Sequence, residues 1–146
     1  MDWKRLITQA APTRVTVNVE LPYERTVAVE ISTLSYAEWL GVETECPEPV
    51  IPRTLAGPNG TKLPNREDLK YRQDLAAVQE ERAYRRLALA LEKGGTAVPG
   101  ATAADKAAAI KAELDAGVAN ALMVFLANAA MGGRATAEAA ADTFRE

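Results

Sequence analysis

Two stretches near the N-terminus alternate strictly between apolar and polar residues. Val15–Leu21 and Thr26–Ser32 each place Val, Leu or Ile at every second position. A period of two is typical of β-strands with one buried face, and the intervening Pro22–Arg25 suits a hairpin loop. Because two strands alone are only marginally stable, we expect this hairpin to lie against a helix or to pair with another chain.

Helical signals flank the hairpin on both sides. Asp2–Gln9 has Trp3, Leu6 and Ile7 on one side and precedes Pro12, which predicts a short N-terminal helix. After the hairpin, Ser35 and Glu38 have the spacing of a capping box, in which each side chain binds the other residue's backbone amide. We therefore expect a helix over about 36–45.

A proline-rich segment follows, and then a long helix. Cys46–Pro64 is rich in Pro, Gly and Asn, with a turn signal at Gly57–Gly60. We expect it to be an irregular loop, a kind of segment that is usually functional or mobile. Asn65 is the predicted cap of the next helix, which ends at about Lys93 before a Gly-Gly stop.

The last third of the chain is rich in alanine. Thr102 and Asp105 have cap spacing, and the apolar residues from Ile110 to Phe125 follow the helical period. This predicts one helix that ends at Gly132-Gly133, and a frayed terminal helix from Thr136 onward.

These elements predict an α+β fold with an N-terminal β-hairpin packed on a mostly helical body of three main helices. The length of 146 residues favours one domain. Within it, 1–34 forms the N-terminal helix and hairpin, 35–93 holds two helices around the loop at 46–64, and 102–146 is the alanine-rich helical part.

Val118–Met131 is apolar on nearly every side, and a helix of this kind must be buried. It is either the central helix of the protein's own core or a helix with one stripe covered by a partner protein or in a homo-oligomer. The sequence is compatible with both interpretations. For the second, the predicted partner-binding residues are Val118, Leu122, Met123, Phe125 and Leu126.

The residues that most often carry catalysis are scarce. The chain has no histidine and one cysteine, Cys46, which stands among glutamates. A zinc site is implausible, and a serine or cysteine nucleophile would lack its usual base. Carboxylates such as Glu80 and Glu81 fit solvated helix faces, and Gly57–Lys62 lacks the spacing of a phosphate-binding loop. We expect no enzyme, no cofactor and no metal.

Charge and hydropathy limit the compartment and the partners. The net charge of −3 argues against a general nucleic-acid binder. Arg82, Arg85 and Arg86 lie within about one helical turn and fit either a phosphate or acidic partner, or, as we prefer, ion pairs within the chain. No run is apolar enough for a signal peptide or a membrane span, so we expect a cytoplasmic protein.

The order of elements resembles a known family. A short hairpin leads into a helix that starts Leu-Ser-Tyr-Ala-Glu-Trp at Leu34–Trp39, followed by a proline-rich break and a charged helix ending at Glu80–Glu92. Over Val15–Glu92 this layout is similar to the tail assembly chaperones of long-tailed bacteriophages. The resemblance implies a non-enzymatic factor of the host cytoplasm that coats the tape measure protein, brings tail tube subunits to it, and leaves before the virion matures.

Two alternatives compete with this expectation. One is a permanent virion component, such as a head-tail connector or a minor tail protein. The other is a DNA-binding regulator that uses the arginine cluster at 82–86. For the chaperone, the hairpin edge is a second candidate contact, because an unpaired strand edge can accept another strand.

Overall fold

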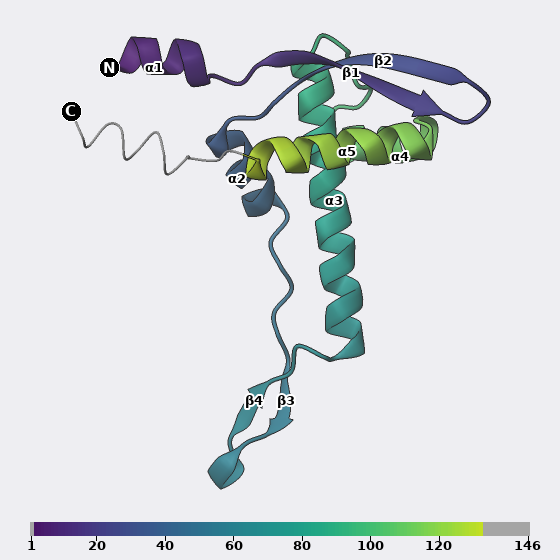
Figure 1. The fold of residues 1–146 in the computed structure, drawn as a ribbon. Coiled ribbons are helices and arrows are strands. Elements are labelled where there is room, and N and C mark those ends of the chain that lie inside the picture. Colours follow the sequence, from purple (N-terminus) through teal and green to yellow (C-terminus); the bar gives the residue numbers. More distant parts are fainter. Residues whose placement is uncertain (1, 133–146) are drawn as a thin grey trace.

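The computed structural model describes residues 2–132 and shows an α+β fold (Figure 1). Two small antiparallel hairpins accompany the helices. In chain order the elements are α1 (Trp3–Ala10), β1 (Arg14–Leu21), β2 (Arg25–Ser32), α2 (Tyr36–Glu45), β3 (Arg53–Ala56), a short 3-10 turn (Pro58–Gly60), β4 (Lys62–Pro64), α3 (Leu69–Lys93), α4 (Ala103–Glu113) and α5 (Ala116–Met131).

The first hairpin forms where the alternation predicts it. β1 and β2 pair antiparallel, with Val17 opposite Val29 and Val19 opposite Val27. Their apolar face packs on α5 and on the C-terminal part of α3 (Figure 1). The expectation that the hairpin lies against helices is therefore confirmed, and burial of this face offsets the weakness of a lone two-stranded ribbon.

The hydrophobic core lies where this hairpin, the C-terminal half of α3, α4 and α5 meet. We call this part, together with α2, the head. Ile31, Leu87 and Leu122 are its largest fully buried side chains. Gly94, just after α3, comes so close to β2 that a Cβ there would lie 2.6 Å from the Cα of Ile31. A glycine at this position therefore lets the helix end against the strand.

α2 begins and ends as predicted. Ser35 accepts a hydrogen bond from the Glu38 amide at 3.2 Å, and the Glu38 carboxylate accepts one from the Ser35 amide at 2.9 Å. This reciprocal pair satisfies two backbone donors that a helix start leaves open.

The prediction of a single helix in the C-terminal third is wrong, because two helices, α4 and α5, are observed. Leu114 is extended, and Asp115 starts a new helix by accepting hydrogen bonds from the amides of Gly117 and Val118. The break turns Leu114 onto the core. The predicted terminal helix after Thr136 lies outside the described residues.

The prediction of an irregular segment at 46–64 is also wrong, because it contains the hairpin β3–β4. The cap of the next helix is misplaced too. Asp68, not Asn65, binds the first turn of α3 through the Tyr71 amide at 2.9 Å. Asn65 instead ties the hairpin together, with its amide nitrogen 3.0 Å from the Thr54 hydroxyl. We call residues 50–72 the arm, whose hairpin extends away from the head past the N-terminal end of α3 (Figure 1).

Candidate protein-binding surface

The structure places three of the five predicted partner-binding residues in the protein's own core. Val118, Leu122 and Leu126 are 3%, 0% and 4% exposed. They belong to the cluster formed with β2 and α3. The alternative that α5 is a core helix is therefore the one observed, and these three side chains are not an exposed binding surface in the folded chain.

The other two predicted residues, Met123 and Phe125, are half-buried and pack against the core. Met123 also lines a small hollow of about 100 Å³ with Trp39 and Arg86. The helix was thus identified correctly as a packing element. Periodicity alone did not show which of its sides stays open, since it is apolar nearly all round.

Among residues 2–132, the clearest exposed apolar face lies on α1. Every residue of this helix is exposed, including Trp3 at 72% and Leu6 and Ile7 at 43% each. Asp2 caps the helix by accepting a hydrogen bond from the Arg5 amide at 2.8 Å. A capped helix with apolar residues on one side normally buries that side, so this face is available for a contact.

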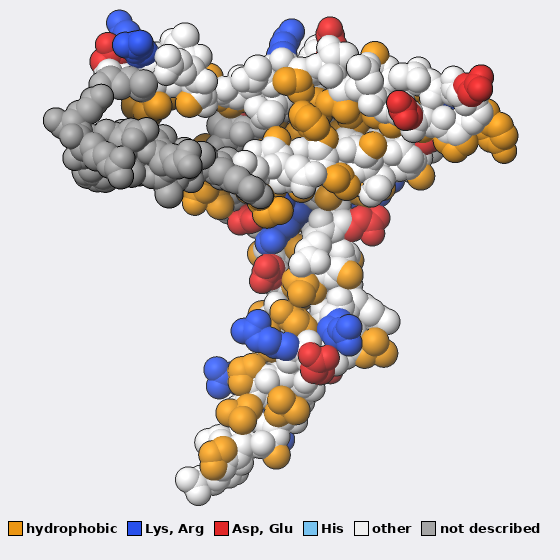
Figure 2. Space-filling view, viewed as in Figure 1, with side chains coloured by type: hydrophobic (Ala, Val, Ile, Leu, Met, Phe, Trp, Pro, Cys, Tyr) orange, Lys and Arg blue, Asp and Glu red, His pale blue; other side chains and the backbone are white. Residues whose placement is uncertain are grey.

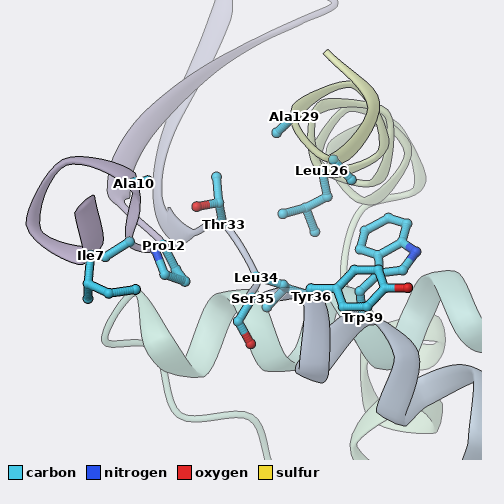
Figure 3. Close-up of a pocket in the computed structure, with 12 residues that line it drawn as sticks. Ile7, Ala10, Pro12, Thr33, Leu34, Ser35, Tyr36, Trp39, Leu126 and Ala129 are labelled. Carbon is cyan, nitrogen blue, oxygen red and sulfur yellow. The ribbon is translucent and has the colours of Figure 1, made fainter. Parts of the chain in front are cut away.

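Beside α1 lies an apolar hollow of about 380 Å³, which we call the α1–α5 hollow. Figure 3 shows Ile7, Ala10 and Pro12 on one side of it and Trp39, Leu126 and Ala129 on the other. The turn from β2 into α2 supplies the residues between them, Thr33–Tyr36. Three elements that are far apart in the sequence therefore share one apolar depression.

Two hydroxyl groups of this hollow are already engaged within the chain. The Thr33 hydroxyl accepts a hydrogen bond from the Thr13 amide at 2.9 Å, and the Ser35 hydroxyl accepts one from the Glu38 amide. Sites for small ligands usually present converging polar groups that fix orientation. The hollow fits apolar side chains of another polypeptide better than a polar small molecule.

The arginine cluster holds α2 and the segment after it to α3. Arg82 donates to the Cys46 carbonyl at 2.8 Å, and Arg85 donates to Glu81 at 3.0 Å and to Glu45 at 3.2 Å. Arg86 donates to Glu43 at 3.3 Å, and its guanidinium lies 3.8 Å from the centre of the Trp39 ring. The preferred prediction of ion pairs within the chain is confirmed.

These contacts weaken the case for the cluster as a nucleic-acid site. The three arginine side chains are only 12–17% exposed. Burial lowers the pKa of the Arg86 guanidinium, although the ion pair with Glu43 opposes this. Phosphate binding would require the cluster to give up carboxylates that it already neutralises.

Two glutamates in the same region have perturbed acidity. Burial raises the pKa of Glu38, but hydrogen bonds from Lys93 and from Ser35 outweigh burial and hold the pKa below its usual value. Burial likewise opposes ionisation of Glu81, while Lys111 and Arg85 lower its pKa overall. These carboxylates are ionised partners of cations, which is a structural arrangement.

The remaining chemical candidates form no site. Cys46 is buried at the end of α2, and Gly57–Lys62 is the turn of the second hairpin. Over residues 2–132 no three side chains of the metal-binding types gather to hold an ion. No helix in this range is long and apolar enough to cross a membrane.

Comparison of the chain with models of protein families, with curated proteins and with solved structures finds no match. The candidate surface therefore stands on geometry alone. The sequence did carry one signal for it: Trp3, Leu6 and Ile7 form one apolar side of the predicted N-terminal helix.

Proposed function

We propose that this protein is a non-enzymatic tail assembly chaperone of a long-tailed bacteriophage, which binds the tape measure protein in the host cytoplasm and helps recruit tail tube subunits. The observation that carries the proposal is the uncovered apolar face of α1 beside the α1–α5 hollow. The resemblance in element order over Val15–Glu92 supplies the specific role.

The hollow suits one stripe of an apolar helix. Its walls are aliphatic and aromatic, and α1 can add Trp3 and Leu6 to the same contact. Helix-in-groove recognition depends on apolar residues at positions i, i+3, i+4 and i+7 that enter such a depression. A tape measure protein, as a long apolar helix, presents stripes of this kind.

The test is co-expression of the full chain with the tape measure protein from the same genome. Wild-type chain is expected to raise the amount of soluble tape measure protein and to co-purify with it. The double variant Leu6→Glu/Ile7→Glu places two charges on the uncovered face of α1 and is expected to abolish both effects. If the tape measure protein stays insoluble with the wild-type chain, the proposal is wrong.

A matched control is Tyr23→Asn at the tip of the first hairpin. Tyr23 is 95% exposed and has a φ of 63°, a conformation that Asn tolerates. This variant is expected to behave like wild type. Mass spectrometry of purified virions separates the chaperone from a permanent tail or connector protein, since a chaperone is absent from mature particles.

A further inference from the structure

The arm differs in charge from the rest of the molecule. Residues 50–72 contain five Lys and Arg and two Asp and Glu, a formal charge of +3. The whole chain carries −3, so the residues outside the arm carry −6. The arm is therefore a basic projection on an acidic protein.

Among residues 2–132, most of this positive charge has no counter-ion. Arg72 lies 3.6 Å from Glu67, and the Asp68 carboxylate is used by the Tyr71 amide. Within the described part of the chain, four further cations of the arm take part in no ion pair, and all four are exposed: Arg53, Lys62, Arg66 and Lys70. Their charge is available to a partner.

Apolar side chains lie among these cations. Leu55 and Leu63 are register partners on β3 and β4, so they sit side by side, and they are 47% and 43% exposed. Val50 and Leu69 add exposed apolar area at the base of the arm. Figure 2 shows apolar side chains along the projecting arm, with basic groups close to them.

Backbone hydrogen bonds hold the arm together, although it adds nothing to the core of the head. Its turn is closed by a hydrogen bond from the Gly57 amide to the Thr61 carbonyl at 2.8 Å, and its base by one from the Asn65 amide to the Pro52 carbonyl at 2.7 Å. Among residues 2–132, no residue of the arm belongs to the main core cluster. A two-stranded hairpin is marginal without a surface to cover it.

We propose that the arm is a second docking surface, separate from the α1–α5 hollow, and that its partner is a different protein with carboxylates around an apolar patch. Charge complementarity would steer the two surfaces together. The adjacent leucines would supply the desolvated centre of the contact. This inference does not rest on the proposed function and stands or falls separately.

Protein is favoured over nucleic acid for two reasons. Exposed leucines between the cations match an apolar patch and have no equivalent partner on a phosphate backbone. The charge of −6 outside the arm also repels a long polyanion. Nucleic acid and a second copy of this chain are outcomes that the experiment distinguishes.

The experiment measures fluorescence anisotropy of a labelled peptide with two adjacent leucines flanked by glutamates. The full chain is expected to bind it, more weakly as salt rises. The variant Arg53→Glu/Lys62→Glu/Arg66→Glu/Lys70→Glu is expected to lose about tenfold or more in affinity, since four exposed charge pairs are removed. Leu55→Ser/Leu63→Ser is expected to weaken binding while leaving the salt dependence in place.

Two controls keep the result specific to the arm. Arg14→Glu/Arg25→Glu changes exposed cations on the first hairpin, and Leu6→Glu/Ile7→Glu changes α1. Both are expected to retain affinity for the peptide, and circular dichroism verifies that every variant is folded. Loss of tape measure binding with retained peptide binding would separate the two surfaces.

Three results would overturn the inference. The first is no binding of the acidic peptide, or binding that the arm substitutions leave unchanged. The second is tighter binding of a DNA duplex than of the peptide, which would make the arm a nucleic-acid contact. The third is self-association in sedimentation that the arm substitutions abolish, which would assign the surface to a second copy of this chain.

Discussion

The head and the arm hold their shapes by different means. The head buries Val, Ile and Leu from the first hairpin against α3 and α5. The arm buries Tyr71 but otherwise relies on turn residues and on hydrogen bonds made by Asn65 and Thr61. Burial of apolar area is the larger source of stability, so the head sets the stability of the molecule, while the arm keeps its apolar and basic side chains exposed.

Truncation of one leucine in each region tests this difference between the head and the arm most directly. Leu122→Ala empties a fully buried site in the head and is expected to cost about 2–5 kcal/mol. Leu63→Ala in the arm removes an exposed side chain and is expected to cost less than about 0.5 kcal/mol. Urea unfolding measures both. Equal losses would mean that the arm belongs to the same cooperative core.

A smaller effect is expected from the cap that starts α2. Ser35→Ala removes the hydroxyl that binds the Glu38 amide, and the expected loss is about 1 kcal/mol of unfolding free energy. Thr44→Ala changes an exposed hydroxyl on the same helix and is expected to remain within about 0.5 kcal/mol of wild type. Similar losses in the two variants would argue that the cap is not what stabilises this helix.

A fall in pH is expected to lower the stability of the head, because Glu38 and Glu81 become protonated. Both pKa values are below the ordinary 4.5, so their stabilising contribution is complete above that pH. It is lost as the pH falls through the lowered pKa values. Melting temperatures from pH 7 to pH 3 test this. Glu38→Gln and Glu81→Gln should flatten the acid decline, and a decline as steep as that of wild type in both variants would contradict this expectation.

The smallest expected effect on global stability comes from the base of the arm. Asn65→Ala removes the hydrogen bonds to the Thr54 hydroxyl and from the Glu67 amide. Amide hydrogen exchange is expected to rise over 53–64, while unfolding of the head changes by less than about 0.5 kcal/mol. Unchanged exchange over this range would show that other contacts fix the arm.

Local patterns predicted the elements whose signals lie close together in the sequence. The period of two gave β1 and β2, and the Ser35–Glu38 spacing gave α2 with both of its ends. Two of the errors fell where two local signals competed. Asn65 and Asp68 are both good caps, and Asp115 is a cap residue inside a stretch that otherwise follows the helical period.

The candidate surfaces required the tertiary structure. The helix at 116–131 is apolar on nearly every side, so its sequence gave no means of telling the buried Leu122 from the exposed Val124. The α1–α5 hollow is lined by residues near positions 7, 35 and 126, which are far apart in the sequence. The second hairpin was missed because its strands are only four and three residues long, and the period of two needs more residues to be visible.

Local sequence signals and composition were enough to predict the first hairpin, the caps and ends of α2, and the scarcity of the usual catalytic residues, because these depend on neighbouring residues or on residue counts. The tertiary structure was needed to show which apolar side chains are buried in the core and which stay exposed on α1 and the arm. Burial depends on how elements from distant parts of the chain pack together, and periodicity within a single element cannot record that packing.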